Sequence, residues 1–159
     1  MSLDSRVRGG LDFDGTIYGS VNETGPEKPF ILAGASAAPG VPDDGFYNGF
    51  YNRLYGEKML ITVNDTKHLS FCDAPLLVSL RDDVTDEQRP VLDAVFGSVN
   101  GMLFAQVLNE ILIDTAQLVL EDETEGLCNL NRIVEGLLVL QQDLPCPLSK
   151  RKVGVRLGS

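Results

Sequence analysis

Three stretches of the sequence have an apolar pattern that predicts β-strands. Apolar and polar positions alternate over residues 6–13, which predicts a short strand that ends at the turn dipeptide Asp14-Gly15. Residues 30–35 form an unbroken apolar run, which is typical of a strand buried on both faces. Residues 58–63 predict a third strand, and the polar turn after it leads directly to His68.

Helical periodicity separates and follows these strands. The acidic pair at 43–44 can cap a helix in which apolar side chains recur at four-residue spacing up to Leu54. Over residues 85–118, apolar side chains recur every three or four positions apart from one seven-residue gap, which predicts one long helix with a wide apolar face. A further helix is predicted over residues 127–140.

This order of elements predicts an α/β fold with about three parallel strands and flanking helices. In such a sheet, functional side chains gather at the carboxyl ends of the strands. Asp14 follows the first predicted strand and His68 follows the third. We therefore expect Asp14 and His68 to lie at the same edge of the sheet.

The composition limits which binding partners and which catalytic groups are possible. The chain of 159 residues has a formal charge of −10 at pH 7, and so acidic a surface repels phosphate backbones, so we expect no nucleic-acid binding. A single histidine excludes multi-histidine zinc sites in a lone chain. Four of the 13 basic residues lie in the last ten positions, where we expect a solvated terminus.

Neither the cysteines nor the N-terminus indicates a cellular compartment for the chain. Cys72, Cys128 and Cys146 lie far apart without a C-x-x-C motif, so the sequence signals neither a zinc site nor a disulfide framework, and at most one bridge can form. The first ten residues lack the apolar run of a signal peptide, and no run of about 18 apolar residues predicts a membrane span. The compartment is therefore not assigned.

An Asp after one strand and a His after a later strand match the chain order of the last two members of a Ser-Asp-His triad. The histidine takes the proton from the serine and returns it to the leaving group, while the carboxylate fixes the histidine tautomer. The gap from Asp14 to His68 spans one strand, one helix and another strand, which fits two adjacent βα units. The sequence thus favours Asp14 as the acid and His68 as the base.

Three segments resemble the C-terminal half of platelet-activating-factor acetylhydrolase-like esterases, which are α/β-hydrolases of the plasma type: RVRGGLDFDGTIYGSV, KPFILAGAS and FYNRLYGEKMLITVNDTKHLSFCDAPLL. The family's acid lies in a Leu-Asp-small-residue context, to which Phe13-Asp14-Gly15 corresponds. Its histidine lies in a His-x-x-Phe-x-Asp context, which His68–Asp73 matches. The resemblance covers residues 4–80 well, the helix at 86–118 loosely, and residues 120–159 hardly at all.

The resemblance implies an esterase that hydrolyses short-acyl or phospholipid-type esters by serine acyl transfer, without a metal ion or organic cofactor. Asp14 then orients His68, and His68 deprotonates the serine. Asp12 is the alternative acid, and we expect strand alternation to let only one of these carboxylates face the histidine. Some full-length relatives are secreted, although this chain shows no signal peptide.

The nucleophile of such a triad is missing from the sequence. No G-x-S-x-G elbow precedes Asp14, and thirteen residues are too few for the strands that carry the serine and the oxyanion-hole amides. Ser36 follows an apolar strand, but the prolines and glycine at 39–42 prevent the helix that an elbow requires. Cys72 is the alternative nucleophile, which we interpret as a packing residue at the start of a helix.

We therefore expect residues 1–120 to be the C-terminal part of an α/β-hydrolase domain that includes a long C-terminal helix. Residues 121–159 are expected to form a divergent helical extension with a basic tail. On this interpretation the chain holds the acid and base of a truncated esterase and is inactive alone. The alternative is a non-catalytic remnant that binds a partner or another subunit through the exposed edge of its sheet.

Overall fold

The computed structural model describes residues 4–38, 41–42, 49–133 and 137–146. The strands are β1 (Gly10–Phe13), β2 (Phe30–Ala38), β3 (Val41–Pro42), β4 (Lys58–Val63) and β5 (Leu137–Asp143). The helices are α1 (Ser20–Thr24), the 3-10 helix η1 (His68–Phe71), α3 (Ala74–Ser79), α4 (Arg89–Phe96), α5 (Gly101–Glu121) and α6 (Glu125–Ile133). The sheet has the order β1-β2-β4-β5, and β3 pairs with β2.

The strand pairing confirms the predicted α/β fold. β1, β2 and β4 are parallel, and β5 joins the far edge of β4 in the antiparallel direction. β4 has the predicted bounds, whereas β1 begins four residues later than predicted and β2 continues three residues further. The predicted helix over 43–54 lies partly outside the described residues, but residues 49–51 are helical.

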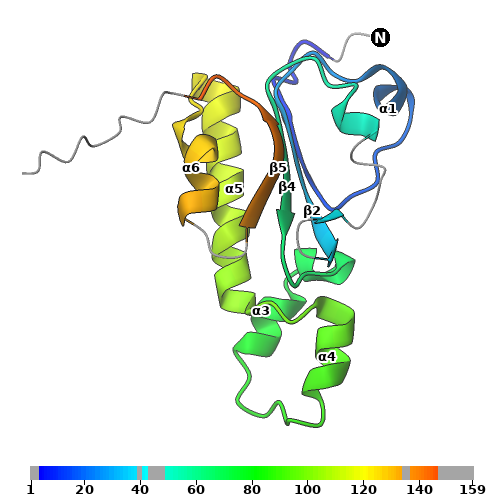
Figure 1. Ribbon diagram of the computed structural model, residues 1–159, viewed down its shortest axis with the longest axis vertical. Helices are drawn as coiled ribbons and strands as arrows, with labels where there is room; N and C mark the ends of the chain where they lie inside the picture. The colour runs from blue at the N-terminus through cyan, green and yellow to red at the C-terminus, as the bar shows by residue number, and fades with distance from the viewer. Residues whose placement is uncertain (1–3, 39–40, 43–48, 134–136, 147–159) are drawn as a thin grey trace, which may run out of the picture.

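The two central strands are buried on both faces, which explains their unbroken apolar sequences. Because successive side chains of a strand point to opposite faces, Ile31 and Ile61 pack towards α5 and α6, whereas Leu32 and Leu60 pack towards Phe50 on the other face. Figure 1 shows α5 and α6 together on one side of the sheet and α1 on the other. The sheet is thus the centre of a three-layer arrangement.

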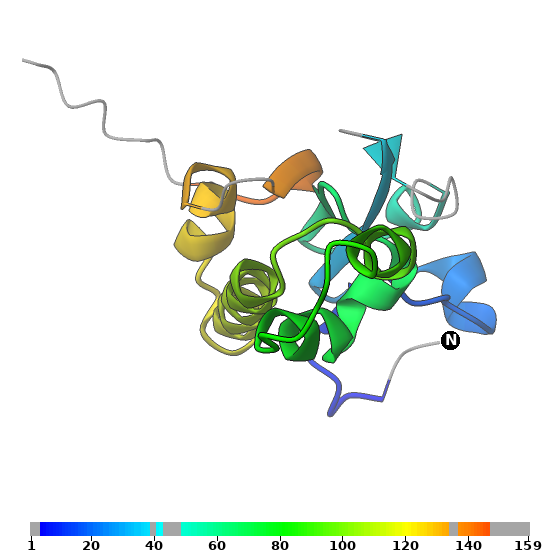
Figure 2. The ribbon, with the colours of Figure 1, turned by 90° about the horizontal axis from the view of Figure 1, so that it is seen from below.

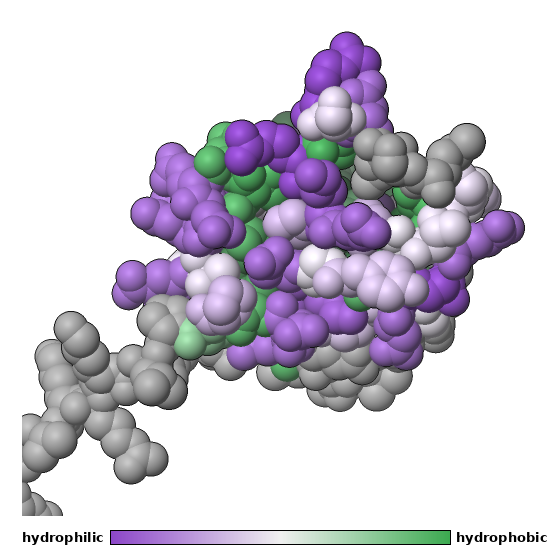
Figure 3. All heavy atoms as spheres, turned by 90° about the horizontal axis from the view of Figure 1, so that it is seen from above, coloured by the Kyte–Doolittle hydropathy of each residue, from purple (hydrophilic) through white to green (hydrophobic). Residues whose placement is uncertain are grey.

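The parallel strands end at one edge of the sheet, next to α3 and α4. The register pairs Phe13 with Ala33, and Ala35 with Val63, so the chain leaves all three strands in the same direction. Viewed from below, α3 and α4 lie over this end of the sheet (Figure 2). The opposite end is covered mainly by hydrophilic side chains (Figure 3).

The single helix predicted over 85–118 is wrong, because the segment forms two helices, α4 and α5. Gly97 ends α4 with a positive φ of 75°, which glycine adopts without the penalty that a Cβ brings. A Cβ at Gly97 would lie 2.1 Å from the carbonyl oxygen of Asp65, so the close approach also requires glycine. Asn100 then caps α5 by accepting a hydrogen bond from the Leu103 amide at 3.0 Å.

The helix predicted over 127–140 is also wrong in its second half. The chain forms α6 as far as Ile133 and then β5, which pairs with β4 from Leu137 to Asp143. A disulfide joins Cys128 of α6 to Cys146, which follows β5. The part of 121–159 that contains β5 therefore belongs to the sheet, and the long helix α5 is not the C-terminal element.

α5 is long and apolar enough, by length and composition, to cross a membrane. However, Phe104, Val107, Ile111 and Leu118 are buried against the sheet, as in the core helix of a globular domain. The buried face of α5 therefore belongs to the core of this fold.

Candidate active site

Asp14 lies immediately after β1, where the chain turns out of the sheet. Its backbone has a φ of 51°, in the left-handed region that Asp and Asn tolerate better than other non-glycine residues. Its amide donates to the carbonyl oxygen of Ala33 at 2.8 Å, which extends the β1–β2 ladder by one bond. Asp14 is therefore fixed to the sheet through its backbone.

His68 is the first residue of η1, after the turn that follows β4. Within that turn, the buried side chain of Thr66 donates to the carbonyl oxygen of Val63 at 2.6 Å, which ties the turn to the end of the strand. After His68, the ring of Phe71 contacts Phe104 with centroids 5.2 Å apart. It also contacts Phe13, the residue before Asp14, with centroids 6.2 Å apart.

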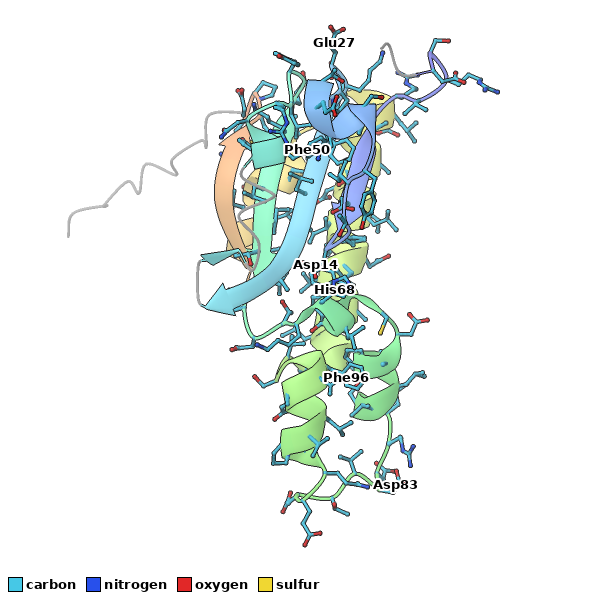
Figure 4. All side chains as sticks on the ribbon, turned by 90° about the vertical axis from the view of Figure 1, so that its right-hand side faces the viewer. Asp14, Glu27, Phe50, His68, Asp83 and Phe96 are labelled. Atoms are coloured by element: carbon cyan, nitrogen blue, oxygen red, sulfur yellow. A yellow bond between two sulfur atoms is a disulfide. The ribbon has the colours of Figure 1, made fainter. Side chains whose placement is uncertain are left out.

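These anchors bring Asp14 and His68 together across 54 residues of sequence. His68 Nδ1 lies 2.7 Å from Asp14 Oδ2, and the Ala35 amide donates to Asp14 Oδ1 at 2.7 Å (Figure 4). The Asp14 side chain is 9% exposed, whereas the His68 side chain is 72% exposed. A buried carboxylate, held by a backbone amide, therefore stands behind an accessible imidazole.

This arrangement suits general acid–base chemistry. When Nδ1 carries the proton and its N–H donates a hydrogen bond to Asp14, the lone pair of the neutral ring lies on Nε2. Nε2 can then accept a proton from a reacting group, and the nearby carboxylate stabilises the imidazolium that forms. The site residues expected from the sequence thus lie in mutual contact.

The carboxylate of Asp12 bonds to the turn that follows β1. Its Oδ2 accepts a hydrogen bond from the Gly15 amide at 3.0 Å, so this carboxylate stabilises the turn that contains Asp14. Strand alternation does not make the choice, because residues two apart in a strand share a face. The carboxylate of Asp14 reaches His68 because β1 ends at Phe13 and the positive φ of Asp14 turns the chain out of the sheet.

The two alternative nucleophiles have different surroundings. Ser36 is buried within β2, and the next described segment is the strand β3, so Ser36 does not lie at a strand-to-helix elbow. Cys72 is exposed, and its thiol donates to the carbonyl oxygen of Leu69 at 3.0 Å. The interpretation of Cys72 as a packing residue at a helix start is therefore wrong, since α3 begins at Ala74.

The described part of the chain contains no group of three or more His, Cys, Asp or Glu side chains arranged to hold a metal ion. A cavity of about 330 Å³ lies between α3 and α4, and its lining includes Pro75, Arg89 and Phe96 but neither Asp14 nor His68. The exposed imidazole of His68 therefore lies outside the lining of this cavity.

Two features of the site could not be assigned from residue types. The Ala35 amide that holds Asp14 is a backbone group, which only the strand register identifies. Ser70, which is completely buried, connects η1 to the end of α4 by donating to the carbonyl oxygen of Phe96. The one signal for Ser70 in the sequence is its position inside the His68–Asp73 segment, which matches the histidine context of the resembled family.

Comparison with known proteins gives a likeness of fold. No family model and no curated protein matches the sequence. Among solved structures, a ferulic acid esterase from Streptomyces cinnamoneus is similar, with a TM-score of 0.66 and 20% sequence identity. The match covers 87% of this chain and 41% of that chain. The chain thus spans less than half the length of the esterase that it resembles.

The likeness supports the α/β fold and shows neither a family nor a reaction. At 20% identity, it does not distinguish platelet-activating-factor acetylhydrolase-like enzymes from other esterases. The substrate class implied by the sequence resemblance, a short-acyl or phospholipid-type ester, accordingly stays a prediction.

Proposed function

We propose that this chain carries the acid and the base of a serine-esterase active site. The observation that carries the proposal is the 2.7 Å contact between His68 Nδ1 and Asp14 Oδ2, in which the carboxylate is buried and the ring is accessible. The similarity of fold to an esterase supports the same reaction class.

The proposed chemistry is acyl transfer in two steps. His68 Nε2 removes the proton from a serine hydroxyl as its oxygen attacks the ester carbonyl, and the imidazolium then gives that proton to the leaving alcohol. Water hydrolyses the acyl-enzyme in the same way. Asp14 holds the Nδ1–H tautomer and offsets the positive charge of the imidazolium, while the Ala35 amide keeps the carboxylate in place.

The serine is expected to come from outside the 159 residues. The outer edge of β1 pairs with no strand in the described part of the chain. A further strand added there in parallel would end beside Asp14, because parallel strands finish at the same edge of a sheet. Since the chain spans 41% of the similar esterase, a protein of that length has room for such strands.

The proposed substrate is a short-acyl or phospholipid-type ester, and the support for this class is the sequence resemblance. An ester of ferulic acid is the competing substrate suggested by the structural neighbour. A series of p-nitrophenyl acetate, butyrate and octanoate together with methyl ferulate would separate these classes by kcat/KM.

The test begins with the coding sequence upstream of Met1. We expect it to encode a G-x-S-x-G segment after a strand pattern, and we expect the longer product to hydrolyse p-nitrophenyl acetate. In that product His68→Ala and Asp14→Asn should each lower kcat/KM by a factor of about 10³ or more. Asp83→Asn is the matched control and should leave kcat/KM within about threefold, since Asp83 is exposed and pairs with Arg81.

The 159-residue chain should show negligible turnover. Turnover that is lost in His68→Ala but kept in Ser36→Ala would contradict the proposal, because the chain would then hold a nucleophile of its own. An upstream region without a G-x-S-x-G segment would instead favour a non-catalytic role.

The non-catalytic role is supported by the open edge of β1, which is a template for pairing with another chain. Light scattering of the 159-residue chain tests it. A chain that pairs through β1 should associate as its concentration rises, whereas a strictly monomeric chain would contradict this role.

A further inference from the structure

The turn that carries His68 is held by the junction between α4 and α5 as well as by the sheet. Thr66 forms an isolated antiparallel bridge with Gly97, and the Val99 amide donates to the carbonyl oxygen of Asp65 at 3.3 Å. The close approach at Gly97 depends on the absence of a side chain there. Residues 97–99 therefore contact the turn at Asp65 and Thr66, three and two positions before His68.

Ser70 makes the matching connection after His68. Its side chain is completely buried, its Oγ accepts from the Lys67 amide at 2.7 Å, and its hydroxyl donates to the carbonyl oxygen of Phe96. The Ser70 amide donates back to the carbonyl oxygen of Lys67 at 2.8 Å. One hydroxyl thus closes the single turn of η1 around His68 and ties it to the last residue of α4.

The imidazole depends on this support because little else holds it. The His68 side chain is 72% exposed, and the one polar contact described for its ring is the bond to Asp14. The direction in which the ring leaves the backbone is consequently set by the conformation of residues 67–70. A 3-10 turn of four residues has poor hydrogen-bond geometry of its own, so side-chain bonds decide whether it persists.

We propose that Ser70 is a positioning residue for His68, and that Ser70 and Gly97 together lock the ring against Asp14 through the α4–α5 junction. The inference rests on the proposed function, because it assigns a purpose to the orientation of His68. Loss of the Ser70 hydroxyl leaves the Lys67 amide and the Phe96 carbonyl without this partner, so the turn loosens and the Nδ1 contact with Asp14 is lost for part of the time.

The presence of a single histidine makes a direct measurement of ring state practical on the full chain. In a ¹⁵N-labelled sample, long-range ¹H–¹⁵N spectra contain the ring signals of His68 alone and show which nitrogen bears the proton. We expect the wild-type chain to hold the Nδ1–H tautomer. Asp14→Asn should give a mixture of tautomers, and Ser70→Ala should shift the spectrum towards that mixture.

The matched control is Ser79→Ala, which removes an exposed hydroxyl that donates to the Leu76 carbonyl oxygen at 2.8 Å. It should leave the His68 ring signals unchanged. Ser70→Cys keeps the packing and supplies a weaker donor, so it should give an intermediate shift if Ser70→Ala does not fold. Gly97→Ala tests the close contact of Gly97 with Asp65 and Thr66, and it should shift the same ring signals of His68.

The outcomes separate the two proposals. A folded Ser70→Ala or Ser70→Cys chain with the wild-type ring spectrum would overturn the positioning role, while leaving the pairing of His68 with Asp14 intact. A wild-type chain without the Nδ1–H tautomer would overturn the proposed function itself. A general loss of stability does not explain a shift of tautomer in a folded variant.

Discussion

The sheet and the helical pair α3–α4 differ in how much of their apolar surface they bury. Ile31, Met59 and Ile61 in the central strands are 0% exposed. In α3, α4 and the residue after α3, the large apolar side chains of Leu77, Leu80, Val91 and Val95 are 40–65% exposed, and no residue of α4 is buried.

This difference divides the candidate site into two parts. Asp14 is fixed by the well-packed sheet, through Ala33 and Ala35. His68 is fixed by a turn whose outer contacts come from the end of α4. The position of the acid should therefore follow the stability of the sheet, while the position of the base should follow the local stability of the helical pair.

Truncation of one apolar side chain in each region tests this difference most directly. Ile61→Ala removes a completely buried side chain from β4 and should lower the free energy of unfolding by about 4 kcal/mol. Val91→Ala, at a 65% exposed position of α4, should change it by less than about 0.5 kcal/mol. Urea denaturation followed by circular dichroism gives both values.

Hydrogen exchange on the same two variants shows where the effect lies. Ile61→Ala should speed exchange of the amides in β2 and β4, whereas Val91→Ala should speed exchange in α4 alone. Equal destabilisation by the two substitutions would contradict the division, since it would mean that α4 buries Val91 against a partner in solution.

The disulfide on the sheet side should have the next largest effect. Cys128 and Cys146 are separated by 18 residues, and the chain entropy released by opening a loop of that size corresponds to about 3 kcal/mol. The double variant Cys128→Ser with Cys146→Ser should therefore unfold at a lower urea concentration. Cys72→Ser is the control, because its free thiol is exposed. A double variant as stable as wild type would show that the bond is not formed in solution.

The buried carboxyl of Asp114, in helix α5 on one face of the sheet, allows a test with a smaller expected effect. Burial, with a contribution from the negative charge of Glu110, raises the pKa of the Asp114 carboxyl, and Gly126 of α6 packs closely against it. A raised native pKa means that the protonated form is favoured, so this contribution to stability is present at low pH and lost as the pH rises through the native pKa.

Asp114→Asn should therefore stabilise the fold at pH 7, and the gain should vanish below the ordinary pKa of aspartate. Thermal unfolding at several pH values measures both. Glu110→Gln, which removes only the neighbouring charge, should give a smaller gain. A pH-independent difference between Asp114→Asn and wild type would contradict the assignment to titration of this carboxyl.

Much of the sheet could be predicted because burial on both faces leaves a clear pattern. The apolar run at 58–63 became β4 with the predicted bounds, and the parallel order placed Asp14 and His68 at one edge. The break between α4 and α5 could not be read in the same way, because the apolar spacing continues through Phe96 and Val99. It is decided by contacts of Gly97 with Asp65 and Thr66, about thirty residues away in sequence.

β5 illustrates the same limit for strands. Residues 137–140 continue a spacing that fits a helix, but antiparallel pairing with β4 overrides that local preference. The pairing of Cys128 with Cys146 depends on this placement, since it brings the residues after β5 beside α6. The proximity of Asp14 and His68 could be predicted from residue type and order, whereas the contacts of the Ala35 amide and the Ser70 hydroxyl required the tertiary register.

The positive φ of Asp14 has a consequence for the evolutionary history of the site. Gly and Asn tolerate this backbone conformation, but neither supplies a negative charge, and most other residues meet a steric penalty. A lineage that kept the fold and lost catalysis would therefore drift first to Asn or Gly at position 14, whereas Asp held there across relatives would indicate selection for the charge. Position 14 thus records conservation of chemistry separately from conservation of shape.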